Sequence, residues 1–142
     1  MRILMVSFFV FFYLACEKDK PDPLIDFEIN KNNWESLNIN SYTYNFQVSC
    51  YCPDEITSPK EVEVIDGEIV IVNNTNYNAE LHWGVLSIEQ LFYVIEEAQK
   101  NKAAVIKAEY HEEKGYPVTV YIDQEEMIAD EEMGYFVSDL NY

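Results

Sequence analysis

The chain has 142 residues, of which 26 are acidic and 9 are basic, so its formal net charge at pH 7 is −17. A chain this acidic repels the phosphates of nucleic acids and the headgroups of anionic lipids, which excludes nucleic acid as a partner. Its 11 Tyr, 8 Phe and 2 Trp exceed the aromatic content of disordered chains and provide the material for the packed core of one domain.

The N-terminus is typical of a bacterial export signal of the lipoprotein type. Arg2 gives a positive start, and the apolar run over residues 3–14 is too short for a spanning helix, which needs about 20 residues. Leu14-Ala15-Cys16 is similar to the lipobox, in which the cysteine is acylated, for example with palmitate, and becomes the mature N-terminus. The alternative is an ordinary cleaved signal followed by a free thiol, which an oxidising compartment disfavours.

These features divide the chain into three parts. Residues 1–15 form a signal peptide, and Cys16 carries the lipid that attaches the protein to a membrane. Residues 16–26 (CEKDKPDPLID) are charged and contain two prolines, which predicts an extended tether. Residues 27–142 form a single globular domain. We therefore expect a lipid-anchored protein of the bacterial cell envelope, at the outer membrane or surface and not in the cytoplasm.

The first half of the domain combines a short helix with three strands. Residues 26–38 predict the helix, with Asp26 as N-cap and Phe27, Asn30, Trp34 and Leu37 near one face. Residues 41–52 (SYTYNFQVSCYC) alternate strictly, which predicts a half-buried strand. Residues 58–74 form a hairpin around Asp66-Gly67, a dipeptide that suits a type I′ turn. Residues 75–84 follow as a polar loop.

The second half begins with the clearest helix, residues 87–102. Ser87 and Gln90 fit a capping box, and apolar residues at helical spacing form one stripe. Residues 103–111, 118–123 and 134–140 read as strands. Because no long crossover joins each pair of strands, an antiparallel sheet is expected. The predicted fold is α+β: a sheet of about five to six strands, helix 87–102 packed on it, and the short N-terminal helix.

Cys50 and Cys52 are the first candidate functional residues. Residues i and i+2 of a regular strand lie roughly 6.6 Å apart, too far for a disulfide unless the strand bends, and Pro53 permits a bend. Three states stay open: a local bond, two free buried thiols, or metal ligation. Zinc would need His82 and His111 to complete a Cys2His2 set, but the spacing matches no zinc signature. We favour a structural bond.

Residues 123–132 (DQEEMIADEE) carry six carboxylates and form the second candidate site. Calcium prefers such oxygen ligands, but at offsets that this loop lacks. A solvated acidic loop is the simpler interpretation. No serine–histidine–acid order, glycine-rich phosphate loop or zinc-protease motif is present, so the sequence indicates no catalytic residue and no cofactor.

Three stretches, residues 33–52, 62–70 and 109–140, resemble a family of bacterial lipoproteins catalogued as domain of unknown function 6174. The residues that match its pattern are Trp34, Tyr42, Tyr44, Cys50, Cys52, Gly115, Tyr116, Pro117, Ile128, Asp130, Tyr135, Val137 and Asp139. Family members often carry Asp-Pro where this chain has His111-Glu112, which weakens His111 as a metal ligand. The resemblance implies a lipid-anchored extracytoplasmic domain and no assigned activity.

We therefore expect a binding or structural module of the cell envelope, with Tyr116, Asp123, Asp130 and Asp139 as candidate binding residues. One alternative is a thiol redox or metal-dependent enzyme that uses Cys50 and Cys52. Another is a calcium-dependent binding module built on residues 123–132. The sequence identifies neither a protein nor a small-molecule partner.

Overall fold

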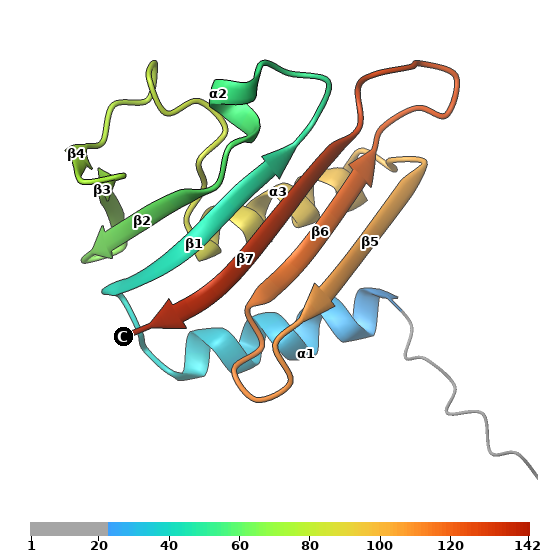
Figure 1. The fold of residues 1–142 in the computed structure, drawn as a ribbon. Helices are drawn as coiled ribbons and strands as arrows, with labels where there is room; N and C mark the ends of the chain where they lie inside the picture. Colours follow the sequence, from blue (N-terminus) through green and yellow to red (C-terminus); the bar gives the residue numbers. More distant parts are fainter. Residues whose placement is uncertain (1–22) are drawn as a thin grey trace, which may run out of the picture.

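The computed structural model describes residues 23–142, which form one antiparallel sheet with two longer helices on one of its faces (Figure 1). The predicted signal peptide and Cys16 lie outside the described residues. The elements are α1 (Pro23–Ser36), β1 (Tyr42–Ser49), α2 (Asp54–Thr57), β2 (Lys60–Ile65), β3 (Glu68–Val72), β4 (Thr75–Asn76), α3 (Ile88–Lys100), β5 (Val105–Tyr110), β6 (Pro117–Asp123) and β7 (Met133–Asn141).

The sheet consists of two antiparallel meanders that meet at its centre. Its strand order is β4-β3-β2-β1-β7-β6-β5, and every neighbouring pair is antiparallel. Helix α3 connects the two meanders. The first and last strands along the sequence, β1 and β7, lie side by side where the meanders meet. The predicted α+β class is confirmed, with seven strands where five to six were expected. The additional strand is β4, two residues within the expected polar loop.

Helix α3 forms as its sequence predicts. The Ser87 hydroxyl accepts a hydrogen bond from the Gln90 N–H (3.3 Å), and the Gln90 side chain accepts one from the Ser87 N–H (2.9 Å). This capping box satisfies two backbone donors that the helix itself leaves unpaired. The apolar stripe is buried against the sheet: Ile88, Leu91, Phe92, Ile95 and Ala98.

Helix α1 begins at Pro23, three residues before the expected start, so Asp26 lies in its first turn and is not the N-cap. Proline suits a first helical position because its fixed φ matches the helix and its missing N–H is not needed there. Residues 23–26 are therefore helical and not part of an extended tether. The helix also ends at Ser36, before Leu37, which is 38% exposed.

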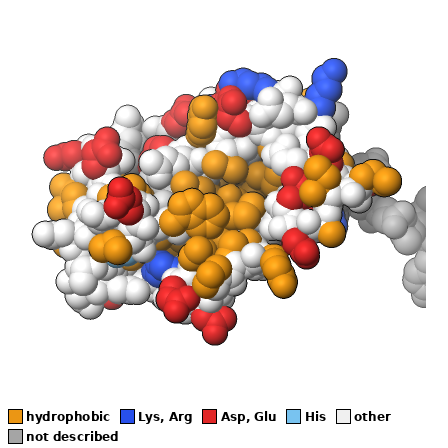
Figure 2. Space-filling view, turned by 90° about the horizontal axis from the view of Figure 1, so that it is seen from above, with side chains coloured by type: hydrophobic (Ala, Val, Ile, Leu, Met, Phe, Trp, Pro, Cys, Tyr) orange, Lys and Arg blue, Asp and Glu red, His pale blue; other side chains and the backbone are white. Residues whose placement is uncertain are grey.

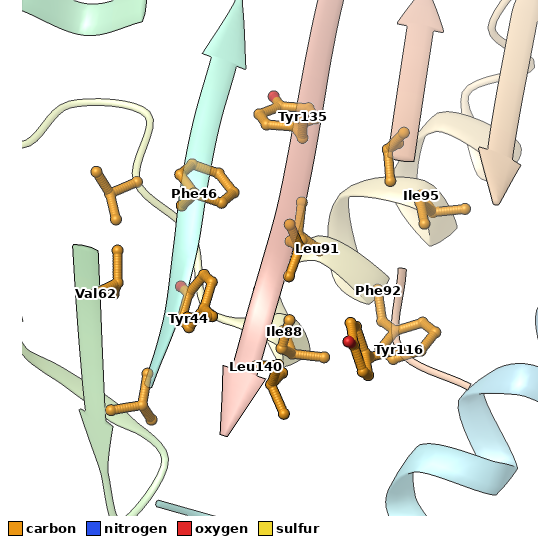
Figure 3. Packing of buried hydrophobic residues seen from close by; sticks show 14 of the residues in the cluster. Tyr44, Phe46, Val62, Ile88, Leu91, Phe92, Ile95, Tyr116, Tyr135 and Leu140 are labelled. Carbon is orange, nitrogen blue, oxygen red and sulfur yellow. The ribbon is translucent and has the colours of Figure 1, made fainter. Parts of the chain in front are cut away.

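One face of the sheet carries the core, and the other carries polar side chains. Strand β1 alternates buried and exposed residues along its whole length, so Tyr42, Tyr44, Phe46 and Val48 point toward the helices. Figure 3 shows Tyr44, Phe46 and Val62 on one side of this core and the α3 residues Ile88, Leu91 and Ile95 on the other. In Figure 2, hydrophobic side chains gather in the middle of the view, with acidic side chains around them.

The turn before β6 requires glycine at position 115. Gly115 has φ +78°, and a Cβ there would overlap the carbonyl oxygen of Asn30 and lie 3.0 Å from the Cβ of Asn33. The β5–β6 turn therefore packs directly on the backbone of α1.

We expect Gly115→Ala to lower the free energy of unfolding by at least about 2 kcal/mol, from the positive φ and the overlap together. Gly67→Ala is the matched control, because Gly67 has φ +83° but no atom within 4 Å of the added Cβ. Its cost is about 1 kcal/mol. Urea unfolding of both variants measures the difference, and equal losses would contradict the close packing of α1 on the turn.

Candidate functional site

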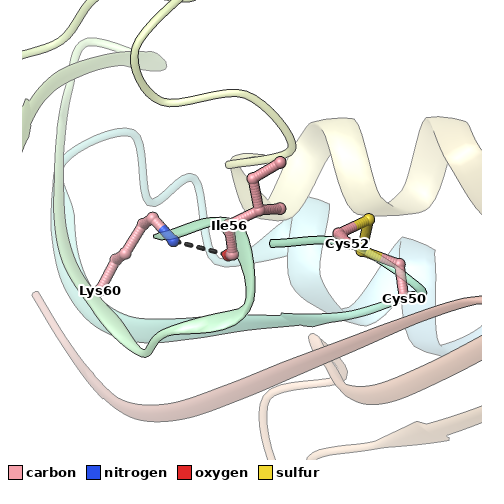
Figure 4. The surroundings of a disulfide bond; sticks show 4 residues. All are labelled: Cys50, Cys52, Ile56 and Lys60. Carbon is pink, nitrogen blue, oxygen red and sulfur yellow. Dashed lines mark hydrogen bonds between the residues drawn. A yellow bond between two sulfur atoms is a disulfide. The ribbon is translucent and has the colours of Figure 1, made fainter. Parts of the chain in front are cut away.

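The two cysteines are joined just after the end of β1. The Cys50–Cys52 S–S distance is 2.07 Å and the two Cα atoms are 5.2 Å apart (Figure 4). Strand β1 ends at Ser49, three residues earlier than predicted. The shorter strand explains the geometry, because the chain bends at Cys50 and brings the two Cα atoms closer than in a regular strand. The favoured local bond is confirmed as a pair at disulfide distance.

Lys60 caps the end of α2, the short helix that follows the disulfide. Its ammonium group donates to the carbonyl oxygen of Ile56 (2.7 Å; Figure 4) and to that of Ser58 (3.0 Å), at the end of α2. Lys60 is only 7% exposed, and this burial lowers the pKa of its ammonium group. The lysine therefore satisfies carbonyl groups that the short helix leaves open, and it is not a free cation.

The N-terminus of α3 is tied to β1 and α1 through one hydroxyl and one carboxylate. The Tyr42 hydroxyl accepts a hydrogen bond from the Ile88 N–H (3.0 Å) and donates one to Glu89 (2.7 Å). The Trp34 indole donates to the other oxygen of Glu89 (3.0 Å). Burial, followed by the nearby Glu89 charge, raises the pKa of Tyr42. The phenol therefore stays protonated and keeps donating.

Tyr44, two residues after Tyr42 on β1, makes a second hydrogen bond from this strand to the segment at the start of α3. Its hydroxyl donates to the carbonyl oxygen of Leu86, and burial raises its pKa. The Trp34 ring meets Tyr42 and Tyr116 edge-on, with centroid distances of 5.6 and 5.8 Å. One structural cluster between α1, β1 and α3 therefore contains four of the five aromatic residues of the family-like pattern: Trp34, Tyr42, Tyr44 and Tyr116. Of these, Trp34 also lines a cavity of about 160 Å³ beside Glu89 and Phe92.

The four candidate binding residues are not brought together. Tyr116 directly precedes β6 and Asp123 is its last residue, and Tyr116 is only 5% exposed. Asp139 lies at a positive φ of 54° and accepts hydrogen bonds from Asn45 (2.8 Å) and Ser138 (2.9 Å), which lower its pKa. These bonds lie where the β1–β7 register shifts. Asp130 is exposed in the loop before β7. Binding by these residues stays a prediction.

Asp123 is the one candidate with an unsatisfied polar atom. Its Oδ1 is buried without a hydrogen-bond partner in the described chain. The neighbouring acidic loop does not surround it with ligands, because no three His, Cys, Asp or Glu side chains within residues 23–142 are grouped to hold a metal ion. The carboxylates of this loop therefore form no cluster of three around a common point.

The two histidines lie in loops, and within residues 23–142 they form no metal-binding group with the cysteines. His82 Nδ1 accepts the Asn78 N–H (3.0 Å), and the ring stacks on Tyr77. His111 Nδ1 accepts the N–H groups of Glu113 (3.2 Å) and Lys114 (3.3 Å). Each imidazole uses a lone pair to hold a turn, which explains both residues without a metal.

A groove of about 710 Å³ lies between α1, α3 and strand β5, within the volume range of small-molecule and peptide sites. Its lining is Pro23, Leu24, Asp26, Ile95, Gln99, Lys102, Ala103, Ile106, Lys107, Ala108, Glu109 and Tyr110. Tyr110 stacks on Phe92 of α3 (6.2 Å), and burial raises the pKa of its phenol. Sequence reasoning missed this groove, although the apolar alternation at Ile106, Ala108 and Tyr110 indicates a face that needs cover.

The observed arrangement is an α+β domain whose antiparallel sheet is covered on one face by two helices and closed by a local disulfide at the end of its central strand. The model of the family of unknown function DUF6174 matches residues 26–142. The chain belongs to this family. No curated protein and no solved structure matches the chain.

We expect Tyr42→Phe to lower the free energy of unfolding by about 2 kcal/mol, because the buried Ile88 N–H loses its acceptor and Glu89 loses a donor. Tyr93→Phe on the same helix is the control, since Tyr93 is 60% exposed and its hydroxyl bonds to no described residue. Its effect should stay within about 0.5 kcal/mol. Chemical denaturation of both variants compares them, and equal stabilities would rule out the proposed role of the Tyr42 hydroxyl.

Proposed function

We propose that this protein is a lipid-anchored, extracytoplasmic module of the bacterial cell envelope, with a binding or structural role and no catalytic step. The Cys50–Cys52 pair at disulfide distance carries the proposal. Such bonds persist in exported proteins and are rare in the reducing cytoplasm. The lipobox-like Leu14-Ala15-Cys16 supplies an independent reason for the same compartment.

The attachment to the membrane would depend on Cys16. None of the helices in the described part of the chain is both long and apolar enough to cross a membrane. A covalently attached lipid at the start of the mature chain would hold the domain close to the bilayer. The helical residues 23–26 leave a tether of residues 16–22, which could span at most about 25 Å.

The groove between α1, α3 and β5 supports the binding role. It combines apolar walls with a few polar groups, the usual composition of a ligand site. Pro23, the first described residue, also lines this groove, so a lipid on Cys16 would keep the groove close to the membrane surface. No specific observation favours the redox, metal or calcium alternatives over this role.

A thiol titration tests the compartment and the lipidation together. Mature protein purified from the envelope and denatured without reductant should show no free thiol, because Cys50 and Cys52 are bonded and the sulfur of Cys16 carries the lipid. One thiol per chain would contradict lipidation of Cys16. Two or more would contradict the disulfide and would favour the thiol redox or metal-dependent alternative.

Membrane fractionation tests the anchor directly. The wild-type chain should fractionate with membranes and gain the mass of a lipid, whereas Cys16→Ala should lose both properties. The matched control is the double variant Cys50→Ala and Cys52→Ala, which removes the same residue type elsewhere and should stay with the membranes. A Cys16→Ala chain that keeps its membrane association and mass would refute the anchor.

A further inference from the structure

Strand β5 ends the sheet with one side unpaired among the described strands (Figure 1). Its pairing with β6 is regular from Val105 to Glu109. The Ala104 N–H donates to the Gln124 carbonyl oxygen, which identifies the even-numbered residues of this stretch as those that bond to β6. The backbone N–H and C=O groups of Val105, Lys107 and Glu109 therefore point outward from the sheet.

The side chains of this edge divide between the two faces. Lys107 lies over the ring of Tyr121 (5.7 Å), on the face opposite the helices, and Glu109 shares that face. Ile106 and Ala108 face the groove and are only partly buried. A single lysine on an edge strand usually opposes pairing with another chain. Here the lysine is followed two residues later by a glutamate, so in an antiparallel pair of two such strands each lysine can lie opposite a glutamate.

From this pattern we propose that β5 is the contact between two copies of the chain. The two strands pair antiparallel about a two-fold axis at Ala108, which joins the two sheets into one. Lys107 then lies directly opposite Glu109 of the second copy, and Glu109 lies opposite its Lys107. Both pairs are hydrogen-bonded pairs, as the outward direction of their backbone groups requires.

The charges select this register over its neighbours. An axis at Lys107 would place two lysines opposite each other, and an axis at Glu109 would place two glutamates opposite each other, which is unfavourable in both cases. Ala108 meets Ala108 of the second copy on the groove face, where the small side chains allow close approach. The two grooves then adjoin, so the apolar walls at each open edge face the second copy and not solvent.

Charge reversal tests the proposal on the full mature chain in detergent, with native mass spectrometry over a range of concentrations. We expect a dimer whose dissociation constant rises tenfold or more in Lys107→Glu and in Glu109→Lys, because two attractive pairs become repulsive. The exchange variant that carries both substitutions should restore dimerization. Glu68→Lys, an exposed charge reversal on β3, is the control and should change nothing.

Three results would overturn the proposal: a monomer at every concentration, a dimer that the single reversals leave intact, or reversals that the exchange variant does not rescue. Because both positions are exposed, the variants keep the fold, and circular dichroism verifies this.

Cysteine cross-linking tests the register in intact cells. Across the axis, the two Ala108 Cα atoms form a non-hydrogen-bonded pair at about 4.5 Å, within the range that a disulfide accepts. Ala108→Cys should therefore give a dimer band that reductant removes, and Lys107→Cys should give much less. A stronger band from Lys107→Cys, or none from Ala108→Cys, would contradict this register.

Discussion

The bond network around the Tyr42 hydroxyl is the contact on which the rest of the domain depends. This single oxygen accepts the Ile88 N–H and donates to Glu89, so it fixes the start of α3 over the middle strand of the sheet. Glu89 also holds the Trp34 indole and thereby positions α1. Because α3 connects the two meanders, its placement decides how the second meander meets the first.

The residues of the family-like pattern acquire a physical meaning from this network. Trp34, Tyr42 and Tyr44 occupy the junction between α1, β1 and α3, and Gly115 allows the β5–β6 turn to approach α1. The spacing of these residues in the sequence therefore reflects the packing of α1, β1 and α3 against one another. In this chain the pattern describes a scaffold, and a ligand site has to be sought elsewhere, at the groove and the free edge of β5.

Local signals in the sequence predicted the elements that local chemistry specifies. The alternation of β1, the capping box of α3 and the Asp66-Gly67 turn all appear as expected. Helix α2 and strand β4 were missed because they are four and two residues long, too short for periodicity to register. The groove was missed for another reason: its walls come from α1, α3 and β5, which are far apart in the sequence and meet only in the folded chain.

The pairing of β1 with β7 places the first and the last strand along the sequence side by side at the centre of the sheet. Such a pair has almost the greatest sequence separation that the domain allows, and its loop closure is correspondingly costly in entropy. Each meander can form from local contacts, but neither can complete its half of the core until the last strand arrives. If the chain were exported with its N-terminus first, the central contact between β1 and β7 would form only after β7 had emerged.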